Sequence, residues 1–443
     1  MFHKLYGWGR SLSSFTYVME CDSAGFDALL DLKTERGIIA RGLGRSYGDS
    51  SLNSGGFSLG FSSLKNLCID GKNGIATVAS GVTISELEQK SLSLGYFPFV
   101  VPGTGSVTIG GAIASDIHGK SHHKVGSFSE YLIEVKLLKA NGSQVIIRPD
   151  DETSELFWAT VGGMGLTGLI LEAKIRLRKV ESAYVTVQES RVKNLDSMLS
   201  TLIQFNDKYL YTVAWIDLSG KFKGRGIVAG ANHSEIQELN RRKKARIHSS
   251  LARRSFTLPF FFRISLVNTA AIKAFNKAWF YKPQGPRIQH VEKFMHPLDV
   301  VSNWNIVYGK KGFVQYQFVV PLDKITVLHE VLKELKKANS PSFLSVLKSL
   351  GNESQGHLGF PMRGWTLAID LPLGNRNLKN LFHEMDRIVI NAGGRFYIAK
   401  DSRMNSMDLP TMYQNLDKWK KIKSEADPLN LWQSDQGRRL GLC

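Results

Sequence analysis

The sequence lacks the features that would take it out of the class of ordinary globular proteins. Its three cysteines, Cys21, Cys68 and Cys443, are far apart and form no CxxC pair, which fits neither a disulfide framework nor a zinc cage and favours a reducing compartment. No run of about 18 apolar residues occurs and the first residues contain no continuous apolar segment, so we expect neither a transmembrane span nor a signal peptide. The absence of low-complexity tracts and fixed-period repeats excludes a disordered chain and a solenoid.

Acidic residues are missing from one long stretch. From Asn240 to Val291 there are twelve Lys or Arg and no Asp or Glu, in a chain whose net charge is +18. The stretch begins RRKKARIHSSLARR at 241–254 and continues as the aromatic SFTLPFFFRISLV at 255–267. It is either a solvated basic loop beside a core helix or a surface for anionic lipid headgroups, where each basic residue contributes about 1 kcal/mol. No nucleic-acid-binding motif accompanies the charge, so we expect no nucleic acid partner.

A chain of 443 residues exceeds the size of one hydrophobic core, so we expect two domains. In the first, strands at 37–42 and 74–81 precede a helix that a capping box of Thr83 and Glu86 opens. The segment 130–149 predicts a hairpin around Asn141-Gly142.

The middle of the chain has longer, separated strands, LYTVAWIDL, GFVQYQFVVP, SFLSVLKSL and GWTLAIDLP, and a helical pattern at 323–338. The whole indicates an α+β protein with a first domain at 1–182, a second domain at 183–394 built on an antiparallel sheet with covering helices, and a tail at 395–443 that returns to the first domain.

Three glycine clusters indicate the kind of ligand that the protein binds. ARGLGRSYGDSS at 40–51 is either a tight turn or a loop whose N–H groups, with Arg41 and Arg45, bind a phosphate. The segment 101–131 has Gly103, Gly105, Gly110, Gly111 and Gly119 among small residues, as expected for a backbone against a large planar ligand. TVGGMGLTGL at 160–169 would complete a cradle for one nucleotide. The HGKSHH stretch at 118–123, within the second segment, offers no carboxylate and no helix, so we expect no metal site.

These motifs, together with QYQFVVP and AKDSR, resemble the vanillyl-alcohol oxidase superfamily of FAD enzymes and, within it, the decaprenylphosphoryl-β-D-ribose 2-oxidases. The resemblance runs almost end to end and implies a two-domain flavoenzyme. Many superfamily members attach the flavin covalently through a histidine in the first loop, where this chain has Arg45, so non-covalent FAD is implied. The implied reaction is oxidation of C2 of a polyprenylphosphoryl-β-D-ribose to the 2-keto sugar. This is the first half of an epimerisation to the arabinose form, finished by a separate NAD(P)H-dependent short-chain reductase at the cytoplasmic, inner face of the cell membrane.

The resemblance also implies site residues. FAD would be held by Arg41, Gly42, Leu43, Gly44, Arg45, Ser46, Tyr47, Gly103, Thr108, Ile109, Gly110, Gly111, Ser115, Asp116, Ile117, His118, Ile170 and Tyr397. The substrate would be held by Lys120, Trp215, Gln315, Gln317, Lys348, Thr366, Ala368 and Lys400. The implied catalytic residues are His118, Tyr47 and Lys400.

Physical chemistry gives these positions roles. Oxidising a secondary alcohol requires a base for the hydroxyl proton, which His118 or Tyr47 could supply. A cation stabilises the charge that a reduced flavin gains, and Lys400 suits that role unless it pairs with the adjacent Asp401. Gln315 and Gln317 alternate on one strand, so both face the same side and can bind sugar hydroxyls.

Two departures from the family pattern concern the substrate. Thr366 stands where mycobacterial members carry asparagine, and Ala368 where they carry cysteine. Thr366 shortens a polar contact near the substrate, so the exact sugar or its phosphate arrangement can differ. Since other superfamily members oxidise aldonolactones and alditols, a soluble sugar, alditol or aldonolactone remains an alternative substrate, and a non-catalytic basic lipid-binding protein of the same fold remains a further alternative.

Overall fold

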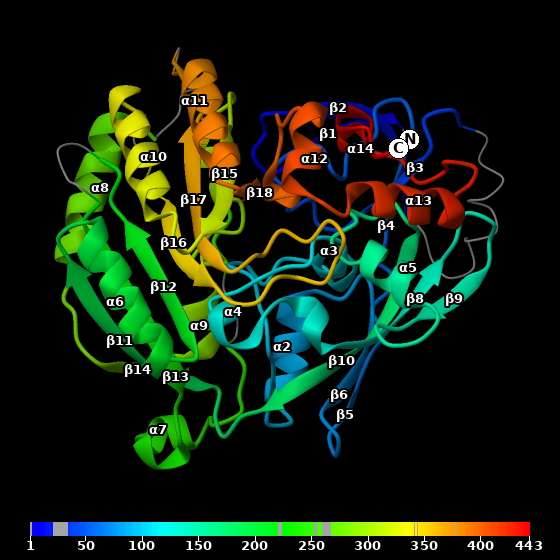
Figure 1. Ribbon diagram of the computed structural model, residues 1–443. Coiled ribbons are helices and arrows are strands. Elements are labelled where there is room, and N and C mark those ends of the chain that lie inside the picture. Colours follow the sequence, from blue (N-terminus) through cyan, green and yellow to red (C-terminus); the bar gives the residue numbers. More distant parts are fainter. Residues whose placement is uncertain are drawn as a thin grey trace.

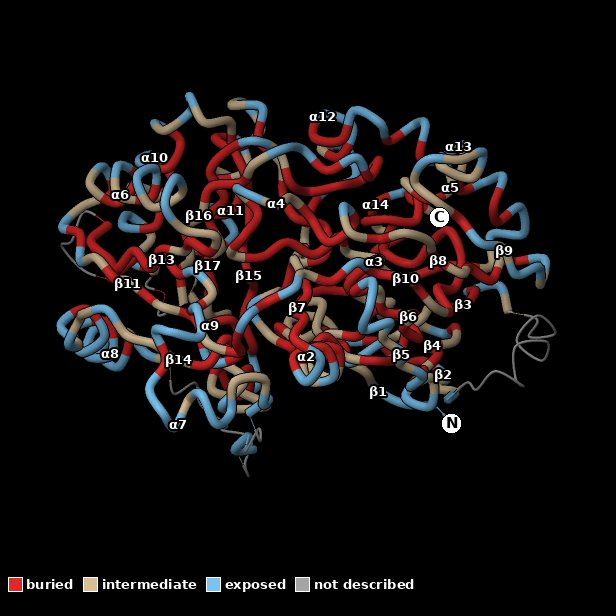
Figure 2. Tube along the Cα trace, turned by 90° about the horizontal axis from the view of Figure 1, so that it is seen from below, coloured by how far each residue is buried: buried red, intermediate tan, exposed pale blue. Residues whose placement is uncertain are grey.

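The computed structural model describes residues 2–20, 34–219, 224–251, 255–258, 267–340, 342, 344–375 and 377–443. Within these residues the strands form sheets of four, six and eight strands. The four- and six-stranded sheets make one lobe and the eight-stranded sheet the other (Figure 1). A buried core runs through both lobes (Figure 2).

The first lobe contains the two smaller sheets. The first has the order β1-β2-β4-β3 and the second β5-β6-β10-β8-β9, with β7 also paired to β10. The strands are β1 Phe2–Tyr6, β2 Ser13–Glu20, β3 Ile38–Arg41, β4 Phe57–Gly60, β5 Leu67–Asp70, β6 Ile75–Ala79, β7 Tyr96–Pro98, β8 Leu132–Leu138, β9 Gln144–Ile147 and β10 Leu169–Lys179. The helices are α2 Ile84–Leu92, α3 Ile109–Ala114, α4 His122–Val125 and α5 Ser154–Thr160.

Local signals in the sequence explain how this lobe begins and turns. Both halves of the predicted capping box of α2 form, because Thr83 accepts from the Glu86 N–H while the Glu86 carboxylate accepts from the Thr83 N–H. The predicted hairpin is confirmed as β8 and β9, and Gly142 at its turn has φ +84. Such a positive φ suits glycine at a tight turn.

The second lobe is an antiparallel sheet of order β14-β11-β13-β12-β16-β17-β15-β18. Its strands are β11 Tyr184–Val192, β12 Tyr211–Ile216, β13 Gly226–His233, β14 Arg287–His290, β15 Phe313–Pro321, β16 Ser345–Leu350, β17 Gly364–Pro372 and β18 Arg395–Phe396. Helices α6 Leu195–Lys208, α10 Ile325–Lys337 and α11 Leu378–Asn391 pack on one face in a shared apolar core (Figure 1). Its other helices are α7 Arg241–Lys244, α8 Thr269–Tyr281 and α9 Val291–Met295.

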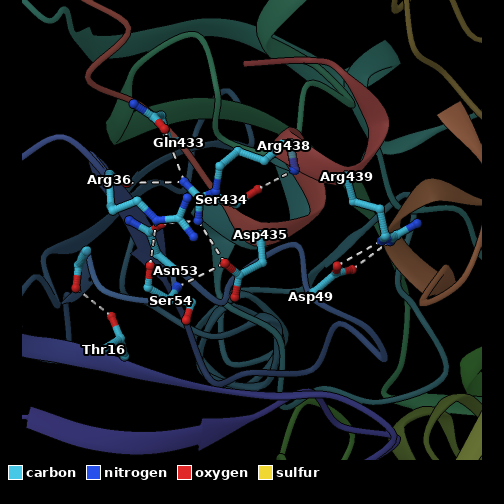
Figure 3. Close-up of polar contacts among 12 residues, drawn as sticks. Thr16, Arg36, Asp49, Asn53, Ser54, Gln433, Ser434, Asp435, Arg438 and Arg439 are labelled. Carbon is cyan, nitrogen blue, oxygen red and sulfur yellow. Dashed lines mark hydrogen bonds and ion pairs between the residues drawn. The ribbon is translucent and has the colours of Figure 1, made fainter.

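The last residues contact the first lobe through charged groups. Helices α12 Leu409–Met412, α13 Leu416–Ala426 and α14 Asp435–Leu440 follow β18. Arg438 donates to the side-chain oxygens of Asn53 and Asp435, each at 2.7 Å, and Arg439 forms a double contact with Asp49 at 2.7 and 2.9 Å (Figure 3). The expected domain boundaries at residues 182 and 394 stay a prediction.

The basic stretch is partly described. Residues 252–254 and 259–266, which include most of the aromatic run predicted to meet lipid, lie outside the described residues. In the described part, α8 buries Ile272, Asn276 and Phe280, while Phe275 and Trp279 are exposed. No helix of the described residues is long and apolar enough to span a bilayer.

Candidate active site

The face of the eight-stranded sheet opposite α6, α10 and α11 carries the candidate substrate residues. Gln317 on β15 pairs with Ala368 on β17, which pairs with Val346 on β16, which pairs with Trp215 on β12. Because these four residues share one register across four adjacent strands, their side chains lie in one row on one face.

Neighbouring rows complete this face. Lys348 lies opposite Thr366, and Gln315 lies opposite Asp370. The intervening residues Tyr316, Leu347 and Leu367 point into the core with α10 and α11. The structure therefore brings Trp215, Gln315, Gln317, Lys348, Thr366 and Ala368 together on the face turned toward the first lobe.

His118 reaches this sheet face from the glycine-rich loop of the first lobe. Its Nδ1 lies 3.2 Å from Nζ of Lys348, and its Nε2 lies 3.1 Å from Nε2 of Gln317. A neutral imidazole has one N–H, so the two contacts depend on the charge of Lys348. When Lys348 is neutral, its Nζ accepts from Nδ1–H and the Gln317 amide donates to Nε2. When Lys348 is protonated, it donates to Nδ1 instead, the ring proton lies on Nε2, and the Gln317 amide has to turn so that its oxygen accepts from Nε2–H.

Burial and like charge lower the pKa values of this cluster. The pKa of His118 falls well below its usual range because of burial and the nearby Lys348, His122 and Lys400. Burial, with repulsion from Lys120 and Lys400, lowers the pKa of Lys348 to about 7. The site therefore holds a neutral histidine beside a lysine that changes charge near neutral pH.

Lys400 is the second lysine of the cluster, on a 3-10 helix at Ile398–Lys400. Its Nζ lies 3.9 Å from the centre of the Tyr47 ring, and burial lowers its pKa to about 8 while Asp370 opposes that shift. The carboxylate of Asp401 accepts from Arg439 at 2.8 Å, so Asp401 is paired with the C-terminal helix and Lys400 is turned to the site.

The first glycine loop follows β3 and packs on the second. Tyr47 is buried and meets Phe313 edge to face at 5.5 Å, whereas Leu43 is 48% exposed. The Arg45 guanidinium lies 3.9 Å above the Trp8 ring, and Arg41 donates to the main-chain oxygens of Tyr6 and Ser51. The first loop also contains Gly42, Gly44 and Ser46. A Cβ added at Gly42 would lie 2.3 Å from Oγ1 of Thr108, so the two glycine loops are in close contact at this point.

The second glycine loop runs into α3. Thr108 caps this helix by accepting from the N–H of Gly111, and Ile109 and Gly110 donate to the oxygens of Val82 and Ser80. Beyond the helix, Asp116 is buried, has φ +38 and accepts from Ser354 at 2.5 Å. The Ile117 oxygen accepts from Phe128, which fixes the chain just before His118.

Three further predicted residues lie around these loops. Tyr397 donates to the oxygen of Ser115 at 2.8 Å and stacks on Phe360. Ile170 is buried in the core of the first lobe. Lys120 donates to the oxygen of Met295 at 2.7 Å, so it bridges the glycine loop and α9.

The two glycine loops fit a flavin dinucleotide. In the described part of the chain, the main-chain N–H groups of Leu43, Gly44 and Arg45 donate to no other main-chain group, and Gly103 has open space where a Cβ would stand. Free N–H groups beside Arg41 and Arg45 suit a pyrophosphate, and a glycine with open space suits a planar ring at close approach.

Two residues of the site were missed by sequence reasoning. Asp370 is fully buried on the substrate face and accepts from Gln315 at 2.6 Å. His122, whose pKa burial and Lys348 lower to about 3, accepts from the N–H of Gly351 at 3.0 Å. The alternation Thr366, Ala368, Asp370 in GWTLAIDLP would have placed Asp370 on this face, but nothing local indicated the position of His122.

Comparison with known proteins identifies the chemistry that this arrangement serves. Residues 30–148 match the family model of the FAD binding domain, and residues 368–440 match that of D-arabinono-1,4-lactone oxidase. The chain is 35% identical over 451 residues to a decaprenylphosphoryl-β-D-ribose oxidase of Mycolicibacterium smegmatis, covering 99% of this chain and 97% of the relative. It is 30% identical over 130 residues to the human Δ(24)-sterol reductase, covering 29% and 25% of the two chains.

These matches and the site define an FAD-dependent oxidoreductase with the two-domain α+β fold of the vanillyl-alcohol oxidase type. Within that class, the chain belongs to the decaprenylphosphoryl-β-D-ribose oxidase family. The expectations for fold, cofactor and enzyme class are confirmed. The individual site residues stay predictions.

Proposed function

We propose that this enzyme oxidises C2 of a polyprenylphosphoryl-β-D-ribose to the 2-keto sugar, and that a separate NAD(P)H-dependent short-chain reductase completes the epimerisation. The observation that carries the proposal is the similarity along the whole chain to a relative named for a decaprenylphosphoryl-β-D-ribose substrate. The polar side chains on this face of the sheet, Trp215, Gln315, Gln317, Lys348 and Thr366, support it, because a sugar needs several hydrogen-bond partners on one surface.

Different residues of the site assist the removal of the hydride and of the proton from the alcohol. Bound FAD would supply the hydride acceptor, and the negative charge of its reduced form would need a nearby cation. Lys400 supplies that cation. His118 takes the hydroxyl proton, and neutral Lys348 behind it can hold the proton as an ammonium group. Tyr47, fixed by Phe313 and Lys400, orients the hydroxyl.

Three lysines of the site also favour the binding of an anionic substrate. Burial lowers the pKa values of Lys120, Lys348 and Lys400, and repulsion from Lys120 and Lys400 lowers that of Lys348 further. A bound phosphate would relieve that repulsion, so the cluster favours a substrate that carries a phosphate over a neutral sugar.

The experiment is anaerobic mixing of the FAD-loaded enzyme with polyprenylphosphoryl ribose, and separately with free pentoses, alditols and aldonolactones. Bleaching of the flavin absorbance by the lipid-linked sugar alone supports the proposal. The match of residues 368–440 to D-arabinono-1,4-lactone oxidase favours the second candidate, oxidation of a soluble lactone or polyol. Rapid bleaching by those compounds would establish that candidate instead.

We further propose that the enzyme works at the inner, cytoplasmic face of the cell membrane and docks through α8. Phe275 and Trp279 stack on its outer side at 6.0 Å, and Lys282 lies 3.9 Å above the Trp279 ring. Lys273 and Lys277 are exposed on the same helix. Aromatic rings among lysines suit the interface of an anionic bilayer, where the substrate's prenyl chain resides.

Sedimentation with vesicles of anionic lipid tests the docking surface. Replacing Lys273 and Lys277 by Gln, or Trp279 by Ala, should lower the bound fraction severalfold. The matched control replaces the exposed Lys333 and Lys336 of α10 by Gln, which removes the same charge elsewhere. Equal binding by all three proteins would refute docking through α8.

A further inference from the structure

Asp370 is a buried carboxyl group at the centre of the site that the proposed reaction does not yet use. It lies on β17 opposite Gln315, and no part of its surface is exposed. The Gln315 amide donates to its Oδ1 at 2.6 Å, and the Tyr308 hydroxyl donates to its Oδ2 at 3.3 Å. A short bond from an amide to a carboxyl oxygen is typical of an ionised acceptor.

Gln315 connects this carboxyl to the candidate catalytic residues. Its amide also interacts with Tyr47 and opposes the rise in the pKa of that hydroxyl, and the Tyr47 ring lies under Nζ of Lys400. An amide nitrogen has two N–H groups, so one can serve Asp370 while the other serves Tyr47. An ionised Asp370 only accepts hydrogen bonds, and it therefore fixes the amide with its nitrogen toward Tyr47.

We propose that Asp370 is a positioning residue of the active site, which holds the Gln315 amide toward Tyr47 and provides the negative charge that faces Lys400. The inference rests on the proposed function, because it assigns a role to Lys400 in the same reaction. Asp370 acts through these neighbours and need not contact the substrate.

The charges around Asp370 are consistent with this role. The groups that face it are Tyr308, Gln315, Tyr47 and Lys400, from four different segments. Burial raises the pKa of Asp370 to about 7, while Gln315, Lys400 and Tyr308 oppose the shift. Asp370 in turn raises the pKa values of Lys400 and Tyr47. Losing its negative charge should therefore lower both.

Two variants separate its charge from its packing. Asp370→Asn has the same shape without the charge. Tyr308→Phe keeps the charge and the ring stacked on Phe313 at 4.0 Å, and removes one hydrogen bond to the carboxyl. The FAD-loaded full-length protein is used throughout, and bound FAD shows that each variant has folded.

The first readout is the pH at which Lys400 loses its proton, taken from the pH dependence of the visible spectrum of bound FAD and from the alkaline limb of flavin reduction. In Asp370→Asn this pH should fall by about one unit, since an attractive charge is gone. In Tyr308→Phe it should not fall. An unchanged value in Asp370→Asn would overturn the proposal.

The second readout is the infrared band of a protonated carboxyl group, which needs no substrate. The wild type should lose such a band between about pH 6 and pH 8, and Asp370→Asn should lack it. In Tyr308→Phe the band should persist to higher pH, because the carboxylate has lost a donor. A wild-type band that persists unchanged above about pH 8 would show a neutral Asp370 and overturn the proposal even if Asp370→Asn does not fold. A wild type that shows the band but is not reduced by polyprenylphosphoryl ribose would refute the proposed function alone.

Discussion

Nζ of Lys348 lies 3.2 Å from Nδ1 of His118, a contact that joins the eight-stranded sheet to the glycine-rich loop of the other lobe. Since the lysine pKa is about 7 and that of the histidine is well below its usual range, the pair has one buried proton acceptor whose charge changes near neutral pH. The contact therefore brings a group whose charge changes near neutral pH to the place where the lobes meet.

Lys348→Met should slow flavin reduction by the sugar substrate about 10²-fold, the lower end of what a positioned acid or base contributes. The wild-type rate should rise with pH through about 7 as Lys348 loses its proton, and this rise should be weaker in the variant. Stopped-flow absorbance across that pH range measures both. A variant whose rate and pH profile match the wild type would remove Lys348 from proton transfer.

Lys400→Ala should slow flavin reduction by about 10²- to 10³-fold while the protein still folds and binds FAD, because a fixed cation in the site is lost. Lys420→Ala, on the exposed side of α13, is the matched control and should reduce at the normal rate. Single-turnover kinetics under anaerobic conditions measures the step directly. Normal reduction in Lys400→Ala would exclude the assigned role.

Non-covalent attachment of FAD can be tested without substrate. Arg45 stands in the first glycine loop with its guanidinium 3.9 Å above Trp8, and an arginine forms no bond to the flavin ring. Precipitation with acid should therefore leave a colourless pellet and a yellow supernatant that contains FAD. A yellow pellet would show a covalent link through another residue.

The parts of the fold that the sequence predicted depend on neighbours in the chain. The capping box at Thr83 and the turn at Gly142 are set within a few residues, and the shared face of Gln315 and Gln317 follows from strand alternation. The contact of Lys348 with His118 joins residues 230 positions apart, so no local pattern indicates it.

Ion pairs between residues far apart in the chain are likewise not indicated by a local pattern. The adjacent Asp401 was the alternative partner for Lys400, yet it pairs with Arg439, 38 positions away. A carboxylate can be reached by any cation that tertiary packing brings near, so sequence adjacency predicted the wrong partner here. The role proposed for Asp370 was hidden for the same reason, because it depends on groups from four other segments of the chain.

The ion pairs of Arg439 predict how much the C-terminal helix contributes to the free energy of unfolding. The side chain of Arg439, 26% exposed, pairs with Asp49 and Asp401, which are 7% and 6% exposed. Arg439→Ala leaves two buried carboxylates without their cation, and breaking such a buried pair costs about 3 to 5 kcal/mol. We expect urea unfolding to show a loss of that order and FAD to be held less tightly, because Asp49 ends the first glycine loop.

Arg387→Ala is the control, because it breaks an exposed pair with Glu384 and should change stability by no more than about 0.5 kcal/mol. If the two variants unfolded at the same urea concentration, the C-terminal helix would not be stabilising the loop through these charges.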